Sequence, residues 1–339
     1  MTLVFIGGGL GPPSSLTLGA VEALKRCEVV YVDCYTSFWD ERTLEYVEGL
    51  AKSLVKSYRR MLEEEAHKVV ADARTKVVGV LAPGDPFIAT THSSMMEIAA
   101  RKGVKVEVVN GVSIISAAIS LSGLHVYKFG KTATLPKTED PALYTQPVKI
   151  LEENLSRQAH TLLLLDTAEG GLSVDVGLNK LMQAAANMGK RVVDEKTLAI
   201  ALARVGHSDQ VVKAGRVEEL LVENYPPSPH CLIIPSALHF SEKEVVKTYA
   251  LNPETVERMV PPNPVAERVS AYLDKCRQFI EKSGRIEHLK QYVNYVNCYV
   301  EDAEKFMESG DFVNALLSVG YAEGLLDALR LRGEVDFEW

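Results

Sequence analysis

The chain has 339 residues, of which 47% are apolar and 24% are charged, a balance typical of a globular protein rather than a disordered or fibrous one. At roughly 100 to 200 residues per domain, this length predicts two or three domains. Acidic residues outnumber basic ones by 45 to 37, a net charge of −8, and no block of Lys and Arg could follow a phosphate backbone. The composition therefore disfavours nucleic acid as a partner.

The N-terminus and the cysteines bear on the cellular compartment. The first nine residues, MTLVFIGGG, hold an apolar run too short to span a membrane and lack the basic start of a signal peptide. The five cysteines are odd in number and include no C-x-x-C pair, so they predict neither a disulfide framework nor a zinc site. We therefore expect a cytoplasmic protein with no membrane contact.

The first 124 residues alternate Val-rich runs with helical stretches. Strands are predicted at residues 2–6, 28–33, 76–82 and 104–110, and helices at 15–26, 41–52, 92–102 and 113–123. Short strands that alternate with helices are typical of a parallel sheet with helical crossovers. Residues 1–124 are therefore predicted to form an α/β domain.

A second domain is predicted at residues 125–260. It begins with an irregular connection up to about Pro147, in which Lys128 and Lys131 could also touch a substrate. Strands are then predicted at residues 160–166, 197–205 and 231–236, helices at 148–158 and 177–188, and a turn at Gly215. This domain is predicted to be mixed α/β.

The composition changes after Pro264. Amphipathic stretches with apolar residues at helical spacing cover residues 266–283, 286–309 and 312–332. Because they carry no strand signal and are separated by short turns, we predict a helical domain at residues 265–339 built from antiparallel helices.

A glycine-rich loop, Gly7-Gly8-Gly9-Leu10-Gly11, follows the first predicted strand, and Asp33 ends the second. Glycines allow a ligand to approach the backbone, and a carboxylate at a strand end can hold ribose hydroxyls. The dinucleotide fingerprint G-x-G-x-x-G nevertheless fails, because its third glycine falls on Pro12 or Ser14 depending on the register. The loop is therefore either a nucleotide-binding loop or a tight turn between strand and helix.

Two loops that follow later strands point to a ligand site. Asp85 lies in the segment Ala82-Pro83-Gly84-Asp85-Pro86 at the carboxyl end of a buried strand, where open α/β sheets bind ligands. The flanking prolines and Gly84 fix the loop and present the carboxylate rigidly. Ser113 offers a hydroxyl at a helix N-terminus beside the same edge. An ordinary Asp turn and a plain N-cap are the alternatives, but together the two loops outline a pocket.

Several segments, taken in chain order, resemble one enzyme family. They are FIGGGLG, DCYTSF, LAPGDPFIATTH, GLHVYKFGKTATLP, HTLLLLD and PHCLIIPSALHF. Gly-Asp-Pro after the third predicted strand, without a dinucleotide fingerprint, resembles the tetrapyrrole methylase-like group of S-adenosylmethionine methyltransferases. The closer resemblance, from Met1 to about Val260, is to the archaeal, diphthine-forming branch of that group.

The resemblance implies a fold and a cofactor. The fold is α/β, with two α/β domains of the tetrapyrrole methylase type and the cofactor in the cleft between them. The tail lies outside the usual enzyme as an α-helical appendage and resembles a small archaeal helical domain of unknown function. The implied cofactor is S-adenosyl-L-methionine.

The resemblance also places the cofactor site. The positions are Leu10, Asp85, Ile88, Ser113, Ile114, Leu165, Val205 and His230. The aliphatic side chains can enclose an adenine and a thioether-like chain, and Asp85, Ser113 and His230 supply polar anchors. Without the resemblance, Leu165 and Val205 would be interpreted as core residues of apolar strands and His230 as a structural histidine.

In the branch that this chain resembles, methyl groups pass to the amino group of a 3-amino-3-carboxypropyl histidine on translation elongation factor 2. The resemblance thus implies an N-methyltransferase, with that factor as its partner and commonly a homodimer. Because the sulfonium is already activated, aligning the groups and removing water are the main tasks, and we predict no dedicated side-chain base. Residues 35–37, 125–128 and Lys131 are candidates for the acceptor side.

Two other functions stay open. One is a carbon methyltransferase of corrin or porphyrin synthesis on the same fold, against which the segment KFGKTATLP argues. The other is a noncatalytic cofactor-binding module, which would bind without turnover. The histidines show no metal-ligand spacing such as H-x-x-x-H, so no metal is proposed.

Overall fold

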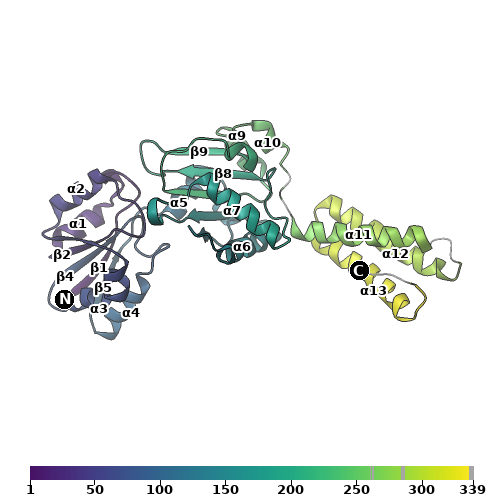
Figure 1. Cartoon of the computed structure of the whole chain (residues 1–339), viewed down its shortest axis with the longest axis horizontal. Helices are drawn as coiled ribbons and strands as arrows, with labels where there is room; N and C mark the ends of the chain where they lie inside the picture. The colour runs from purple at the N-terminus through teal and green to yellow at the C-terminus, as the bar shows by residue number, and fades with distance from the viewer. Residues whose placement is uncertain (260, 262, 284–286, 336–339) are drawn as a thin grey trace. The chain divides into compact units, whose positions relative to one another are not determined.

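The computed structural model describes residues 1–259, 261, 263–283 and 287–335 (Figure 1). The chain divides into two compact units, Met1–Pro261 and Pro262–Trp339. The predicted domain end at residue 260 and the predicted start of a tail helix at residue 286 lie outside the described residues. The predicted boundary at residue 124 falls inside the first unit and stays a prediction.

The first unit contains two five-stranded sheets. The first sheet has the strand order β3-β2-β4-β1-β5, and its neighbouring strands are parallel. Its strands are β1 Thr2–Gly7, β2 Val29–Asp33, β3 Leu54–Ser57, β4 Val77–Ala82 and β5 Lys105–Val109. The parallel sheet predicted from alternating strands and helices is confirmed.

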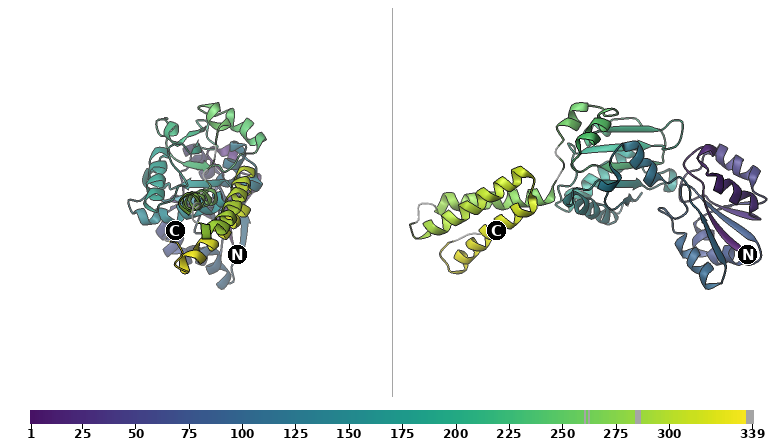
Figure 2. Two further views of the ribbon diagram at one scale, coloured as in Figure 1. Left: turned by 90° about the vertical axis from the view of Figure 1, so that its right-hand side faces the viewer. Right: turned by 180° about the vertical axis from the view of Figure 1, so that it is seen from behind.

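Helices cover both faces of this sheet, which explains why its central strands are apolar throughout. One face carries α1 Leu18–Arg26 and α2 Glu41–Leu50, and the other carries the π-helical turn η2 Arg60–Glu64, α3 Ala66–Asp72 and α4 Ser93–Arg101 (Figures 1 and 2). Along β1, Val4 and Ile6 belong to the first of these cores, and Leu3 and Phe5 to the second. The helix predicted from residue 15 starts at Leu18, after the short 3-10 helix η1 Pro13–Ser15.

The second sheet is mixed, with the strand order β6-β7-β10-β8-β9. Its strands are β6 Ala133–Leu135, β7 Thr161–Leu165, β8 Leu198–Ala203, β9 Val211–Arg216 and β10 His230–Ile234. The pair β6–β7 is parallel, and the other neighbouring pairs are antiparallel. The predicted mixed α/β architecture is confirmed.

The connection predicted as irregular is more regular than expected. It contains the 3-10 helices η3 Val126–Lys128 and η4 Pro141–Tyr144 as well as β6. The predicted turn at Gly215 is also corrected, because this residue lies within β9. Both segments are short or lie at a sheet edge, where an apolar repeat has little length in which to show.

Helices also cover both faces of the second sheet. α6 Thr145–Ser156 and α7 Val174–Asn187 pack on one face, and α5 Ile114–Ser122, α9 Phe240–Lys247 and α10 Pro253–Glu257 on the other. The short elements η5 Ala168–Gly170 and α8 Val217–Leu220 follow β7 and β9. Although α5 follows the first sheet in the chain, its Ala118 is buried in a core with Leu162, Ile200 and Ile233 of the second (Figure 1). The helix therefore links the two sheets.

The second unit is helical throughout its described part. Its helices are α11 Pro264–Ser283, α12 Lys290–Ser309 and α13 Phe312–Leu331, with the 3-10 helix η6 Glu287–Leu289 before α12. They share one core, to which Leu273, Val296 and Leu326 contribute. By length and composition alone α13 could cross a membrane, but its residues Val319 and Leu326 are completely buried in this core. The predicted helical appendage is confirmed.

A buried ionic cluster ties the connection between the two sheets to α9. The completely buried carboxylate of Glu242 accepts hydrogen bonds from the backbone N–H groups of His125 and His239, at 2.7 and 2.8 Å, and from Lys128 Nζ at 2.7 Å. His160 Nε2 lies 3.1 Å from the same carboxylate. Burial raises the pKa of Glu242, but these donors outweigh it and lower the pKa to about 2. The connection is thus fixed by one carboxylate.

We expect Glu242→Gln to lower the free energy of unfolding at pH 7 by about 2–3 kcal/mol, because it leaves Lys128 beside a buried site without a counter-charge. A carboxyl whose folded pKa is depressed stabilises the protein above its unfolded pKa and loses that effect as the pH falls toward the folded value. The difference between wild type and variant should therefore shrink as the pH falls from about 5 toward the folded pKa of about 2. Urea unfolding at several pH values measures it.

Glu244→Gln is the matched control, since Glu244 lies on the same helix with an exposed side chain paired to Lys247. It should change the urea midpoint little. A Glu242→Gln variant with the wild-type midpoint at pH 7 would contradict the assignment of Glu242 as the anchor of this connection.

Candidate functional site

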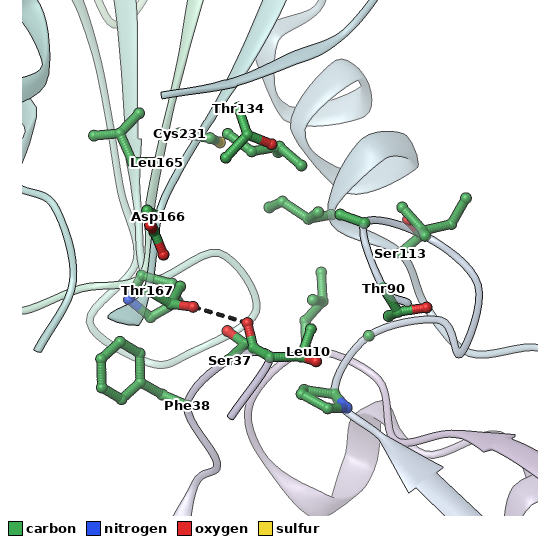
Figure 3. Close-up of a pocket in the computed structure, with 18 of the residues that line it drawn as sticks. Leu10, Ser37, Phe38, Thr90, Ser113, Thr134, Leu165, Asp166, Thr167 and Cys231 are labelled. Carbon is green, nitrogen blue, oxygen red and sulfur yellow. Dashed lines mark hydrogen bonds between the residues drawn. The ribbon is translucent and has the colours of Figure 1, made fainter. Parts of the chain in front are cut away.

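A cavity of about 390 Å³ lies where loops of the two sheets in the first unit meet (Figure 3). The segments after β1, β2, β3 and β4 and the start of α5 line it from one sheet, and β6, β7, β8, β10 and the segments after β7 and β8 line it from the other. Thr134, Leu165 and Asp166 lie across the cavity from Thr90 and Ser113. The carboxyl ends of parallel strands, which contribute here, are the usual ligand-binding edge of an open α/β sheet.

Glycines allow three strand ends of the first sheet to touch. Gly7 ends β1, Gly84 follows β4 and Gly111 follows β5, and a Cβ atom on Gly7 or Gly111 would collide with the backbone of the other two. Gly9 and Gly84 also exchange backbone hydrogen bonds of 3.0 and 2.8 Å. The glycine-rich loop is thus a tight packing element, and this packing sets the positions of Leu10 and Asp85 on the cavity wall.

The same loop meets the second sheet through another glycine. Gly206 follows β8 with φ +90°, and a Cβ atom there would collide with the carbonyl oxygen of Leu10. A second link is the hydrogen bond of 2.8 Å from the Thr167 hydroxyl to the Thr36 carbonyl oxygen, drawn as a dashed line in Figure 3. Both links lie at the cavity wall, so the two sheets meet where the site is formed.

Asp85 holds its own loop and the neighbouring strand end. Its carboxylate accepts hydrogen bonds from Phe87 N at 3.0 Å, from Asn110 Nδ2 at 3.0 Å and from Gly111 N at 3.3 Å. The residue is 7% exposed and lines the cavity. The Asp turn, which the sequence offered as the alternative to a ligand site, is therefore present. The carboxylate of Asp85 also lines the cavity wall.

Asp33 ends β2 and is completely buried. Its carboxylate accepts hydrogen bonds of 2.9 Å from Tyr35 N and Thr36 N and a further one from the Thr36 hydroxyl. His92 Nε2 lies 3.2 Å from Asp33 Oδ2, and His92 Nδ1 lies 3.0 Å from the carbonyl oxygen of Pro86. Burial raises the pKa of Asp33, but the hydrogen bonds from His92 and Thr36 outweigh it and lower the pKa below its ordinary value.

Asp33 is therefore a positioning residue rather than a ligand group. It does not line the cavity, so it is not placed to hold ribose hydroxyls, as the nucleotide-loop alternative for the glycine-rich segment supposed. Through His92 it instead connects the loop of residues 33–37 with the loop that carries Asp85.

Two histidines line the cavity from the second sheet, His207 and His230. His230 Nε2 lies 2.7 Å from the carbonyl oxygen of Pro226, so this nitrogen carries the proton and donates. Its Nδ1 is buried and has no hydrogen-bond partner in the described chain, which leaves a lone pair without a donor. Burial, followed by the Arg204 guanidinium, lowers the pKa of His207. The lowered pKa favours the neutral form of the His207 ring near pH 7.

The eight positions that the sequence assigns to the cofactor come together. Leu10, Asp85, Ile88, Ser113, Ile114, Leu165, Val205 and His230 all line this cavity. Sequence reasoning missed other lining residues, among them Phe38, Arg59, Glu63 and Thr134. Phe38 and Thr134 lie in segments that carry the family resemblance, whereas Arg59 and Glu63 lie in a segment without any motif signal.

The candidates for the acceptor side separate in the structure. Tyr35, Thr36 and Ser37 line the cavity. Lys128 pairs with Glu242, and Lys131 Nζ lies 2.8 Å from the carboxylate of Glu153. Neither lysine lines the cavity. The expectation that these two lysines touch the acceptor therefore loses its support.

Asp166 and Tyr35 at the cavity wall are poorly suited to act as general bases. Asp166 accepts hydrogen bonds from Lys137 N at 3.0 Å and from Ala168 N at 2.9 Å, so both of its carboxylate oxygens already have a donor. Burial, together with the Asp33 and Glu63 carboxylates, raises the pKa of Tyr35 to about 12. Among the described residues, no group of three or more His, Cys, Asp and Glu side chains could hold a metal ion. The cavity is thus suited to binding and alignment.

A parallel sheet followed by a mixed sheet, with a ligand-sized cavity lined by both, is the α/β architecture of the methylase class. Residues 2–221 match the family of Tetrapyrrole (Corrin/Porphyrin) Methylases, and the chain belongs to that family. It is an S-adenosylmethionine-dependent methyltransferase. Residues 266–334 match a second family, described as a protein of unknown function, DUF357.

Within the family, the chain is similar to proteins named diphthine synthase. The protein from Archaeoglobus fulgidus is 34% identical over 259 residues, which cover 76% of this chain and 99% of that protein. The one from Staphylothermus marinus is 38% identical over 269 residues, covering 76% and 96%. A crystal structure of a diphthine synthase, 34% identical, covers 77% of this chain and 100% of its own, with a TM-score of 0.69.

We expect Gly111→Ala to weaken S-adenosylmethionine binding at least tenfold, because the added Cβ would force apart the ends of β1, β4 and β5 at the cavity wall. Overpacking of this kind should also cost about 1–3 kcal/mol of stability. Isothermal titration calorimetry measures the affinity. Gly49→Ala is the matched control, since Gly49 lies in α2 with no atom within 4 Å of the added Cβ.

The control should bind the cofactor as wild type does and gain roughly 0.5–1 kcal/mol, the usual gain for alanine inside a helix. Wild-type affinity in the folded Gly111→Ala variant would show that the contact between the strand ends does not shape the cofactor site.

Proposed function

We propose that the chain methylates the amino group of 3-amino-3-carboxypropyl histidine on translation elongation factor 2, forming diphthine in diphthamide biosynthesis. The observation that carries the proposal is that relatives named diphthine synthase match along 94–99% of their own length, while the residues assigned to the cofactor line one cavity. The identity of the acceptor is thus inferred from the relatives, and the reaction is assigned to the cavity.

The cavity fits S-adenosyl-L-methionine in size and chemistry. Its volume of about 390 Å³ lies within the usual range for small-molecule sites, and its wall combines aliphatic side chains with hydroxyl, carboxylate and imidazole groups. The unpartnered His230 Nδ1 can accept a hydrogen bond from an amino or hydroxyl group of the cofactor. Asp85, Ser113, Leu165 and Val205 are proposed to complete the cofactor site.

The cofactor supplies a methyl group that its sulfonium already activates. The protein's part is to hold the acceptor in line with that group and to exclude water. The carboxylates at the cavity, Glu63, Asp85 and Asp166, all have hydrogen-bond partners in the chain, and Tyr35 has a pKa of about 12. We therefore infer that the amine enters uncharged and that solvent takes its proton, with no dedicated side-chain base.

The proposal extends to the cellular setting. It describes a cytoplasmic enzyme that acts as a homodimer on elongation factor 2, without nucleic acid or membrane. The net charge of −8 supports the absence of nucleic acid. The second unit has a core of its own and matches a separate family, so we propose that it is an appendage rather than part of the methylation site.

The test is mass spectrometry of archaeal elongation factor 2 that carries the unmethylated precursor, incubated with the full chain and S-adenosylmethionine. We expect the modified histidine to gain mass in methyl steps, and the final mass counts the transfers. A factor that lacks the precursor should gain nothing, and a tetrapyrrole offered instead should remain unmethylated. Methylation of the tetrapyrrole alone would replace the proposed acceptor, and binding without any transfer would favour the noncatalytic alternative.

His230→Phe is expected to raise the dissociation constant for S-adenosylmethionine about three- to tenfold, the effect of one lost hydrogen bond. The ring volume is kept, but the acceptor nitrogen is removed. His67→Phe, an exposed histidine in α3 outside the cavity, is the matched control and should bind as wild type does. Equal affinities for the two variants would remove His230 from the cofactor site.

A further inference from the structure

One end of the cavity wall carries a polar cluster that the assigned cofactor positions leave unused. Glu63 Oε1 accepts a hydrogen bond from the Thr91 hydroxyl at 2.8 Å and one from the Tyr35 hydroxyl at 3.1 Å, and these two hydroxyls lie 2.9 Å apart. Arg59 Nε lies 3.5 Å from the same carboxylate oxygen. All four residues line the cavity, so the cluster faces whatever ligand enters it.

Arg59 is the permanent cation of this wall. Among the described lining residues it is the sole Arg or Lys, whereas three carboxylates line the cavity. Its guanidinium carbon lies 5.7 Å from the centre of the Tyr35 ring, within cation–π range. Glu63 meets the Nε side of the guanidinium, and the terminal amino groups of Arg59 make no hydrogen bond within the described chain. The fork at the end of the side chain is therefore held in place yet available.

The available fork matches a carboxylate. Two parallel N–H groups of a guanidinium bind both oxygens of a carboxylate at once, a geometry that an ammonium cannot reproduce. The proposed acceptor is a 3-amino-3-carboxypropyl group, which carries one carboxylate beside the amine to be methylated. A cation at this position would also disfavour the protonated amine nearby, since like charges lower an amine pKa.

We infer that Arg59 binds the carboxylate of the acceptor group and thereby sets the amine toward the cofactor. This inference rests on the proposed function. The cofactor contains the same amino-carboxylate, but Arg59 is more exposed than any of the eight assigned cofactor positions, among which Ile88 is the most exposed at 38%. The Arg59 side chain is 70% exposed, whereas Leu165 and Val205 of the cofactor set are 3% and 5% exposed. An acceptor attached to a large protein must reach the cavity from the exposed side.

The test compares Arg59→Gln with Arg60→Gln in the full chain. Arg60 is the matched control because it is the next residue, has an equally exposed side chain, pairs with Glu65 and does not line the cavity. Steady-state kinetics with elongation factor 2 carrying the precursor gives KM and kcat, and calorimetry gives the dissociation constant for S-adenosylmethionine. Thermal unfolding checks that both variants fold.

We expect Arg59→Gln to raise the KM for the factor about ten- to a hundredfold, the effect of losing hydrogen bonds to a charged group. Its cofactor dissociation constant should stay within about twofold of wild type, and Arg60→Gln should match wild type in both. Arg59→Lys keeps the charge but not the fork, so its KM should fall between the two.

The other outcomes overturn the inference in distinguishable ways. An unchanged KM in Arg59→Gln, with an active wild type, would exclude a contact between Arg59 and the acceptor. Weaker cofactor binding by the same factor as the rise in KM would assign the carboxylate to S-adenosylmethionine instead. A wild-type enzyme that transfers no methyl to the factor would refute the proposed function, and the assignment of Arg59 would fall with it.

Discussion

The buried pair of Asp33 and His92 holds together the loops on which the cavity depends. Two aligned backbone N–H groups and the Thr36 hydroxyl satisfy the carboxylate, His92 Nε2 lies 3.2 Å from it, and His92 Nδ1 reaches the carbonyl oxygen of Pro86. A buried charge is tolerated only when it is satisfied in this way. One consequence extends across the molecule, because the loop shaped by Asp33 presents the Thr36 carbonyl oxygen to Thr167 of the second sheet.

Close backbone contact supplies the second constraint. Parallel strands deliver their carboxyl ends to the same edge, but side chains would normally keep those ends apart. Gly7 and Gly111 remove that obstacle within the first sheet, and Gly206 does so against Leu10 of the glycine-rich loop. The glycines thus act on a ligand indirectly, since they fix the positions from which Leu10 and Asp85 line the cavity. The dinucleotide fingerprint is absent from this segment, and its glycines instead allow close packing of strand ends and loops.

Whether an element can be predicted from the sequence depends on the length of its apolar pattern. Continuous apolar runs identify β1, β2 and β4, because strands buried on both faces need apolar residues at successive positions. β3 at the sheet edge has four residues and includes Lys56, so the pattern is too short to recognise. The segment that follows supplies Arg59 and Glu63 to the cavity, and only the tertiary fold brings it beside Tyr35. Leu165 and Val205 could be assigned through the family resemblance alone, since an apolar strand residue gives no sign of whether it meets a ligand.

The ion pairs Glu242–Lys128 and Glu63–Arg59 differ in burial, and this difference gives them different roles. Glu242 is completely buried, and its pKa of about 2 reflects donors that leave neither it nor Lys128 free for another partner. Arg59 and Glu63 form a longer pair in which the arginine side chain is 70% exposed. Separating a buried pair is costly, whereas an exposed pair has little net energy to lose and can exchange partners with a ligand. The first pair therefore fixes the connection between the sheets, and the second is suited to recognition at the cavity rim.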